Sequence, residues 1–299
     1  MDYKKIFNTM VRETAMYLMN NNISTMVLGV SGGLDSTVTA AICHEVVNGY
    51  KNQNFRFIGV SLPCSSNTDT ENDSAMECLK AFCKDGDYWT ENLQKEYLLM
   101  KATCEQHTES THISQGNIKA RLRMIYLYNL ASTMNGIVMD TDNLTEHYLG
   151  FFTIHGDVAD YNPIGGLWKH EVYELAKYIK SYYEDKFIKP HISVEKQEEL
   201  VHKINAIDYA IKITPTDGNG VNDLGDMGQI APEFANDINY DAYRKVDEIL
   251  DEYINVDATL PNAYSKYSRE VVDNIIKRCK NTNFKRHKMP IVIERSKYN

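Results

Sequence analysis

Short apolar runs alternate with amphipathic stretches along most of this 299-residue chain. Runs of consecutive apolar or β-branched residues are typical of strands buried in a parallel sheet; they occupy residues 25–30, 55–62 and 136–140. Apolar residues spaced three or four apart follow these runs and predict helices; the main ones are residues 37–47, 69–82, 115–134 and 169–183. Strands that alternate with helices form right-handed βαβ units. We therefore expect an α/β fold: a doubly wound, Rossmann-like parallel sheet flanked by helices.

The remaining segments predict helices and one long loop. Residues 1–20 mix charged and apolar side chains, which predicts an amphipathic helix and not a signal peptide. Three more helices are expected near the C-terminal half; they are residues 184–208, 241–253 and 262–280. Residues 214–228 are rich in Gly, Asp and Asn, which is typical of a loop. Because no repeat or linker divides the chain, we expect one domain over residues 1–299.

Charge and cysteine content exclude several classes of protein. The 32 Lys and Arg against 41 Asp and Glu give a formal charge of −9, and no basic block occurs, so nucleic acid is not an expected partner. No run approaches the roughly 18 apolar residues of a membrane span. The six cysteines form no Cys-x-x-Cys pair. We expect reduced thiols in a cytoplasmic protein.

The sharpest chemical signal is the sequence Gly-Val-Ser-Gly-Gly-Leu-Asp-Ser at residues 29–36, between a predicted strand and a predicted helix. Such a turn leaves backbone N–H groups free to bind an anion, and Ser31 and Ser36 add hydroxyl donors. The loop matches neither a Walker A motif nor a dinucleotide fingerprint. Asp35 would repel phosphate unless a cation lay between them, which indicates Mg²⁺ bound to a pyrophosphate. The alternative is a plain Gly-rich turn with an Asp cap.

This loop resembles the signature of the ATP pyrophosphatases, the adenine nucleotide alpha-hydrolase-like enzymes that cleave ATP between its α and β phosphates and transfer AMP. Two further blocks resemble the ammonia-dependent NAD synthetases within that group. One is Gly-Asn-x-x-Ala-Arg-x-Arg-Met at residues 116–124, and the other runs from Thr141 through Glu146 to Lys169. The order and spacing of the three blocks are more specific than any block alone.

The resemblance implies a role for individual residues. It implies that ATP is bound by Gly29, Ser31, Gly32, Gly33, Asp35, Ser36, Thr141, Lys169 and Thr216. Asp35 and Glu146 would ligate Mg²⁺, and without the metal we expect both carboxylates to be nearly solvated. Lys169 would contact the α phosphate, so Asp35 and Lys169 are the catalytic residues it implies. Deamido-NAD would be bound by Arg121, Asp160, Phe284 and Lys285.

The implied reaction is ATP-dependent amidation of deamido-NAD, the nicotinic acid adenine dinucleotide. It passes through an NAD-adenylate that ammonia attacks, and it yields NAD, AMP and pyrophosphate. The resemblance also implies no glutaminase domain and a homodimer. Apolar residues on more than one side of the helix at 115–134, including Met124, Leu127 and Tyr128, indicate a face that a single core does not cover.

The chain departs from the family pattern in the dinucleotide half of the site. Asp140 stands where Gly is usual, Ile154 where Lys is usual, and Phe284 where His is usual, and the stretch from Lys169 to Thr216 is longer. We expect rearranged dinucleotide contacts beside an ordinary ATP site. Two alternatives stay open. A tRNA-modifying ATP pyrophosphatase should have a basic face or catalytic cysteines, and a non-catalytic nucleotide-binding relative would tolerate these departures.

Overall fold

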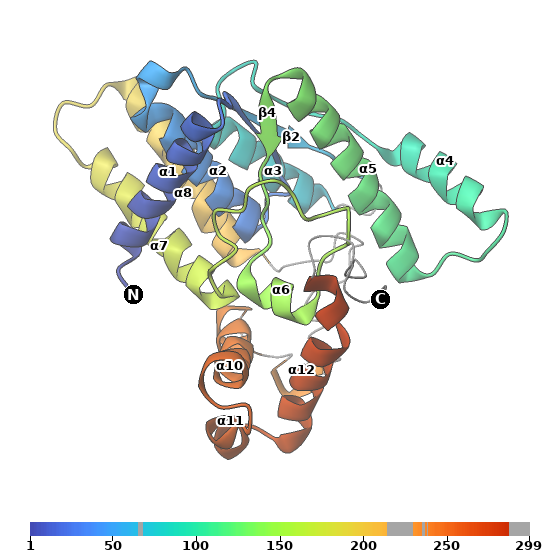
Figure 1. Cartoon of the computed structure of the whole chain (residues 1–299). Coiled ribbons are helices and arrows are strands. Elements are labelled where there is room, and N and C mark those ends of the chain that lie inside the picture. Colours follow the sequence, from blue (N-terminus) through green and yellow to red (C-terminus); the bar gives the residue numbers. More distant parts are fainter. Residues whose placement is uncertain (65–67, 214–229, 235–236, 238, 287–299) are drawn as a thin grey trace, which may run out of the picture.

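The sheet lies at the centre of the molecule and is parallel throughout (Figure 1). The computed structural model describes residues 1–64, 68–213, 230–234, 237 and 239–286. The strands are β1 (Thr25–Gly29), β2 (Arg56–Ser61), β3 (Tyr88–Thr90) and β4 (Gly136–Val138). Their spatial order is β3-β2-β1-β4, which confirms the expected parallel α/β sheet. The sequence did not predict β3, because three residues at a sheet edge carry no recognisable period.

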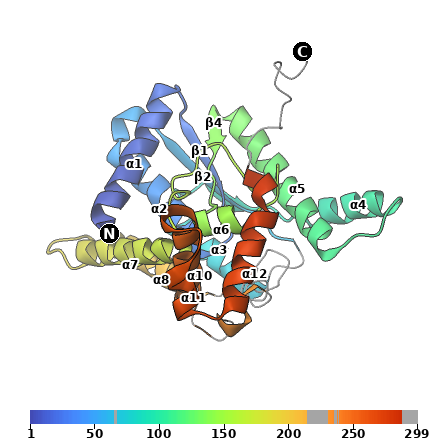
Figure 2. The ribbon, with the colours of Figure 1, turned by 60° about the horizontal axis from the view of Figure 1, so that its bottom comes forward.

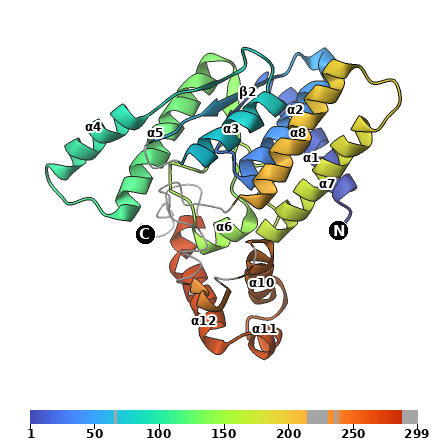
Figure 3. The same cartoon turned by 180° about the vertical axis from the view of Figure 1, so that it is seen from behind.

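Alternating side chains of β1 divide the interior into two hydrophobic cores. Met26 and Leu28 belong to the larger core, and Val27 belongs to the smaller one on the other face of the sheet. Of the helices that contribute to the larger core, five lie on one face of the sheet (Figure 3): α1 (Tyr3–Asn20), α2 (Leu34–Gly49), α3 (Asp69–Phe82), α7 (Lys169–Phe187) and α8 (Val194–Lys212). The sheet is therefore covered on both faces, as a parallel sheet requires.

The opposite face is covered by α5 (His112–Thr133), against which α4 (Gln94–Glu105) packs. The sequence predicted α5 but not α4. Met124, Leu127 and Tyr128 were expected on an uncovered face of α5, and this is wrong, because they are partly buried and line the cleft described below. No described helix is both long enough and apolar enough to cross a bilayer.

The C-terminal helices lie beside α6 (Leu144–Leu149) and form what we call the C-terminal lobe (Figure 2). The lobe consists of α10 (Asn239–Asp251), a π-helical turn (Glu252–Val256), α11 (Pro261–Lys266), α12 (Arg269–Asn281) and a 3₁₀ turn (Asn283–Arg286). The prediction of one helix over 262–280 is wrong. Ser268 interrupts it, since its backbone is extended and its hydroxyl caps α12 by accepting from the Val271 N–H at 3.3 Å.

The predicted helix at 184–208 is likewise divided. α7 continues to Phe187, and α8 begins at Val194, where Ser193 is the N-cap. Pro190 lies in the connection, and proline cannot continue a helix interior. The long segment between Lys169 and residue 213 is thus a helical hairpin, and α8 packs on α3 and α7.

His44 in α2 is a largely buried histidine with a defined tautomer. Its Nδ1 lies 2.8 Å from the Phe82 carbonyl oxygen, which can only accept, so Nδ1 carries the proton. Its Nε2 then accepts from the Asn48 amide at 2.7 Å. Burial, reinforced by the charge of Lys203, lowers the pKa of His44 to about 4. The folded protein therefore favours the neutral ring.

This burial predicts an acid-dependent loss of stability. Because the pKa falls from about 6.5 in the unfolded chain to about 4, the stabilisation is complete above pH 6.5 and is lost as the pH falls. By pH 5 the loss should reach about 2 kcal/mol. His44→Asn keeps an amide donor for Phe82 but cannot gain the proton, so it should lose less stability between pH 7.5 and pH 5 in urea unfolding. The exposed-histidine control His202→Asn should behave like the wild type; equal losses in all three proteins would contradict the prediction.

Candidate active site

A cleft of about 570 Å³ opens at the carboxyl ends of β1 and β4. The chain leaves β1 toward β2 on one side of the sheet and returns to β4 on the other, so this is the point where the strand order reverses. Open parallel sheets bind ligands in the crevice formed at such a point. The walls come from the loop after β1, from α5, from the loops around α6 and from the start of α7.

The loop after β1 is held in place by its own hydroxyl groups. The Ser31 and Ser36 Oγ atoms lie 3.0 Å apart, and Ser31 Oγ accepts from the Gly33 N–H at 3.2 Å. Ser36 in turn donates to the Gly33 carbonyl at 3.1 Å. Gly32 has a φ of +79°, and its carbonyl accepts from the buried Ser74 hydroxyl of α3 at 2.7 Å. The loop is therefore anchored to α3 and presents its serines to the cleft.

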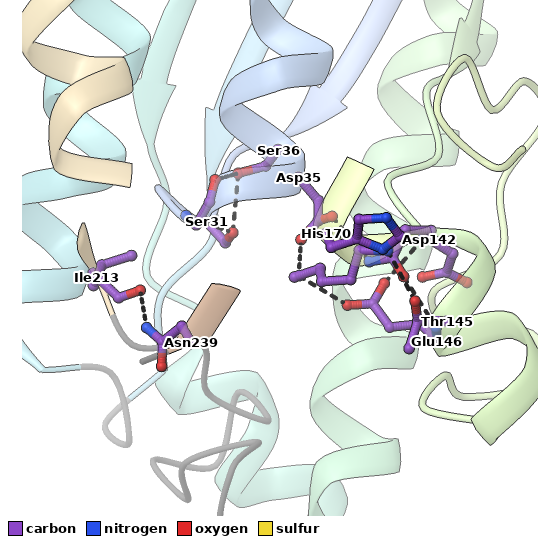
Figure 4. A network of polar contacts seen from close by, with 12 residues as sticks. Ser31, Asp35, Ser36, Asp142, Thr145, Glu146, His170, Ile213 and Asn239 are labelled. Atoms are coloured by element: carbon purple, nitrogen blue, oxygen red, sulfur yellow. Dashed lines mark hydrogen bonds and ion pairs between the residues drawn. The ribbon is translucent and has the colours of Figure 1, made fainter. Parts of the chain in front are cut away.

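Three charged residues from distant parts of the chain meet beside this loop (Figure 4). Asp35 lies in the first turn of α2, Glu146 lies in α6, and Lys169 is the first residue of α7. The Lys169 ammonium donates to Asp35 Oδ2, and it lies 3.3 Å from Glu146 Oε1. The Asn143 amide donates to the other oxygen of Asp35 at 3.0 Å. Both carboxylates are thus oriented toward one position at the mouth of the loop.

The charge of Lys169 is stabilised despite its burial. Burial opposes an ammonium ion, but Asp35 and Glu146 outweigh that effect and hold the pKa of Lys169 well above its usual value. The expectation that Asp35 and Glu146 are nearly solvated is wrong: their side chains are 14% and 18% exposed and are paired with this lysine. Removing either carboxylate would leave the buried Lys169 ammonium paired with only one of these two carboxylates.

The cleft carries more acidic than basic groups. Five of its described lining residues are acidic (Asp35, Glu71, Asp142, Glu146 and Asp157), and four are basic (Arg123, Lys169, Arg278 and Lys285). A polyphosphate in this cleft would meet carboxylates as well as cationic groups, and a cation between the phosphates and Asp35 would reduce that repulsion. Carboxylate oxygens are the ligands that Mg²⁺ prefers in proteins. Asp35 and Glu146 fit this ion, since both lie within reach of one ammonium nitrogen.

Three acidic residues of the cleft, Glu71, Asp142 and Asp157, were not predicted as site residues, and two of them have raised pKa values. Burial raises the pKa of Asp142, and the nearby carboxylates of Asp140 and Glu146 add to the effect. Burial also raises the pKa of Asp157, although its Oδ2 accepts from the Thr153 N–H at 2.6 Å. Both residues belong to the blocks that carried the family resemblance. Their position in the sequence between Thr141 and Lys169, both predicted site residues, could have identified them.

The predicted ATP residues are largely brought together, whereas the predicted dinucleotide residues are not. Of the first group, Gly29, Ser31, Gly33, Asp35, Ser36, Thr141 and Lys169 line the cleft. Gly32 packs on α3, and Thr216 lies outside the described residues. Of the second group, Lys285 lines the cleft and donates to the carbonyls of Gly150 and Phe152 at 2.7 and 2.6 Å.

The other three dinucleotide residues lie away from the cleft lining. Arg121 donates to the Ile154 carbonyl at 3.3 Å from the exposed side of α5. Asp160 accepts from the Val138 N–H at 2.9 Å and from the Tyr128 hydroxyl at 3.1 Å. Phe284 is 62% exposed. These positions place the predicted dinucleotide contacts toward the outer surface of the protein.

Asp140, the departure that follows β4, has a structural explanation. Its Oδ1 accepts from the Asp142 N–H at 2.8 Å and from the Asn162 amide at 3.1 Å. Its Oδ2 accepts from the Ala159 N–H at 2.9 Å. The carboxylate therefore ties the loop that carries Thr141 to the loop that returns toward α7. A glycine at this position could make none of these bonds.

The sheet is parallel, a Gly- and Ser-rich loop follows β1, and an acid–lysine cluster lies where the strand order reverses. These features define an α/β protein with a ligand-binding crevice at its switch point. Within that class, the sequence model of NAD synthase matches residues 6–197, and the chain belongs to the NAD synthase family. An NH(3)-dependent NAD(+) synthetase of Campylobacter jejuni subsp. doylei is 31% identical over 84% of this chain and all of that protein. One from Fusobacterium nucleatum is 26% identical over 98% of this chain and 96% of that protein.

Solved structures confirm the fold. The NMN synthetase of Francisella tularensis superposes with a TM-score of 0.72 at 24% identity, over 98% of this chain and 99% of that one. The NH3-dependent NAD synthetase of Campylobacter jejuni, solved with nitrate, superposes with a TM-score of 0.69 at 24% identity, over 98% and 100%. The family confirms the predicted class of enzyme, a carbon–nitrogen ligase of NAD biosynthesis. Its substrates are small molecules, and ATP is a co-substrate. The family match favours this class over the two alternatives from the sequence.

Proposed function

We propose that this chain activates the nicotinate carboxylate of deamido-NAD by transferring AMP to it from ATP, and that ammonia then displaces the AMP. A carboxylate is a poor electrophile because its leaving group would be oxide, whereas an acyl-adenylate releases AMP. The products are NAD, AMP and pyrophosphate. The reaction needs positioned reactants and electrostatic stabilisation more than a protein nucleophile.

One observation carries the proposal: Lys169 lies between Asp35 and Glu146 at the mouth of the Ser31–Ser36 loop. The loop would hold the β and γ phosphates that leave as pyrophosphate, and Thr141 would contact ATP beside it. Lys169 would turn from the carboxylates to the α phosphate and stabilise the charge that grows there during AMP transfer. Asp35 and Glu146 would hold Mg²⁺, which when bound would offset the phosphate charge.

The test is a complete assay of the purified chain with ATP, deamido-NAD, ammonium chloride and Mg²⁺. NAD, AMP and pyrophosphate should form in equal amounts, and AMP should not form without the dinucleotide. Nucleotide binding without turnover would instead indicate a non-catalytic relative. AMP release that required tRNA would indicate the tRNA-modifying class. Glutamine without free ammonia should not support NAD formation, because we propose that the nitrogen donor is ammonia itself.

A second candidate substrate is nicotinic acid mononucleotide. The observation that favours it is the loss of two polar side chains, at Ile154 and Phe284, from the half of the site expected to hold the dinucleotide. Comparing the two acids as substrates, at equal ATP and ammonia, separates the candidates. If kcat/KM is higher for the mononucleotide than for deamido-NAD, the mononucleotide becomes the proposed substrate.

Phe284→His tests the dinucleotide half of the site. Phe284 is exposed beside Lys285, so a histidine could point to the substrate without disturbing the core. One restored hydrogen bond of about 1.4 kcal/mol should lower the KM for deamido-NAD by about tenfold. The KM for ATP should stay within twofold. An equal change in both constants would show that Phe284 does not contact the dinucleotide.

We also propose a homodimer formed through α4 and α5. Exposed apolar side chains gather on these two helices; they are Leu98, Leu99, Met100, Ile113 and Ile125. An uncovered apolar surface of this kind is typical of an interface. Light scattering at micromolar protein should give twice the chain mass, and Ile125→Glu should return it to one chain mass. A wild-type monomer would contradict this proposal.

A further inference from the structure

The C-terminal lobe contains a carboxylate that takes part in no step proposed so far. Asp247 of α10 is wholly buried. A charged group in such a place is costly unless several hydrogen bonds compensate it. Burial accordingly raises the pKa of the Asp247 carboxyl, while its hydrogen bonds act in the opposite direction. The hydrogen bonds of Asp247 connect it to the first residues of α7, of which Lys169 is one.

Both oxygens of Asp247 accept hydrogen bonds near Lys169. Oδ1 accepts from the hydroxyl of Thr145, and Oδ2 accepts from the His170 N–H at 3.0 Å and from the His170 ring Nδ1 at 2.8 Å. The Thr145 hydroxyl accepts in turn from the Lys169 N–H at 2.9 Å. The first two N–H groups of α7 therefore end on Asp247, one directly and one through Thr145. Figure 4 shows Thr145 and His170 next to Glu146.

Asp247 is linked to the backbone of Lys169, and a second residue of α10 lies against its side-chain ammonium group. The ring centre of Tyr243 lies 5.5 Å from the Lys169 ammonium nitrogen. Tyr243 and Asp247 are four residues apart and so share one face of α10. The same face thus holds the lysine backbone through Asp247 and packs against its charged end through Tyr243. A lysine side chain has four rotatable bonds, so the reach of its nitrogen depends on where its backbone is fixed.

We propose that Asp247 is a positioning residue for Lys169: through Thr145 and His170 it fixes the start of α7 so that the ammonium reaches both Asp35 and the transferred phosphate. The inference rests on the proposed role of Lys169. It gives the C-terminal lobe a part in AMP transfer, although Asp247 itself touches no reacting atom. Loss of an ordinary helix cap lowers stability without a specific effect on turnover. Loss of a positioning residue should lower turnover as well.

The test compares two buried carboxylates of the same lobe. Asp247→Asn keeps the size of the side chain but cannot accept all three bonds, and it should lower kcat by 10- to 100-fold with both KM values within twofold. The matched control is Glu252→Gln, because Glu252 caps α11 by accepting from the N–H groups of Asn262 and Ala263 at 2.9 and 2.7 Å. The control should keep kcat within twofold at a temperature equally far below its own Tm.

Thr145 provides an independent arm that spares the carboxylate. Thr145→Val removes the hydroxyl at constant shape and should lower kcat as Asp247→Asn does, while Thr145→Ser should restore most of the turnover. If Asp247→Asn does not fold, this arm decides. Equal kcat losses in Asp247→Asn and Glu252→Gln, or a wild-type kcat in Thr145→Val, would overturn the inference.

Lys169→Met in the same assay separates this inference from the proposed function. If Lys169→Met turns over normally, the proposed role of Lys169 fails. If it is inactive while Asp247→Asn keeps the wild-type kcat, only the positioning role fails. In the Lys169→Met background, Asp247→Asn should cause no further loss of residual turnover, because a residue that acts through Lys169 has nothing left to position. A further tenfold loss would indicate a general structural defect.

Discussion

Lys169→Met should lower the rate of pyrophosphate release by about 10²- to 10³-fold, the usual effect of removing one group that stabilises a transition-state charge. Methionine preserves the length of the side chain but carries no charge for the α phosphate. ATP should still bind, since Ser31, Gly33 and Ser36 line the same cleft. Quenched-flow measurement of pyrophosphate, with ATP binding followed separately, tests both statements.

The same substitution should also lower the free energy of unfolding by about 3 kcal/mol, because it leaves Asp35 and Glu146 facing each other without a cation. Mg²⁺ should recover part of this loss by occupying the position that the ammonium leaves. The control is Lys177→Met, also in α7, which removes an exposed lysine paired with Glu174 at 2.7 Å. It should change stability by less than about 1 kcal/mol. A Lys169→Met protein with normal turnover would refute the role given to this lysine.

The nucleotide half of the site was predictable because its residues come in short segments whose place follows from local structure. A Gly- and Ser-rich turn after a buried strand must lie at the carboxyl edge of the sheet. Thr141 follows the apolar run at residues 136–140, whose strand β4 pairs with β1 and so ends at the same edge. These residues line one cleft because parallel strands bring their carboxyl ends together.

The pairing of charges could not be predicted in the same way. Asp35 and Lys169 are 134 residues apart, and the sequence assigned them to a metal and to a phosphate, not to each other. Burial of both side chains depends on how α6 and α7 pack against α2, which no local pattern reports. For the same reason Asp247 gave no signal: a single Asp among apolar residues of an amphipathic helix resembles a surface residue until its partners are known.

The errors in the secondary structure have local causes. Apolar spacing continued across Tyr267 and Ser268, so the pattern predicted one helix, yet Ser268 caps a new one. Helix α4 was missed because much of its apolar surface is exposed, at Leu98, Leu99 and Met100, so the core does not impose a period on it. The spacing of apolar residues reflects burial of one helix face against one core. It does not locate a break between two helices, and it does not detect a helix whose apolar residues are exposed.

Gly32→Ala should be among the most destabilising single changes in the chain. Gly32 has a φ of +79°, a conformation that an alanine adopts only with strain. A Cβ atom there would lie 2.4 Å from the Ala75 nitrogen and 2.6 Å from the Ser74 carbonyl carbon, both in the backbone of α3. Backbone strain and overpacking together should cost about 4 kcal/mol. The loop would also move off α3, so ATP affinity should fall as well.

The neighbouring glycine provides the control. Gly33 has an extended backbone that any residue adopts, and a Cβ there would meet only the Ser31 Oγ, at 3.3 Å. Gly33→Ala should therefore stay within about 1 kcal/mol of the wild type in urea unfolding without nucleotide. Because the two positions are adjacent in one loop, the difference between them reports the left-handed backbone of Gly32 together with its contact with α3. Similar stabilities for the two variants would show that the loop is not anchored there, and that its shape must instead come from the Ser31–Ser36 hydrogen bonds.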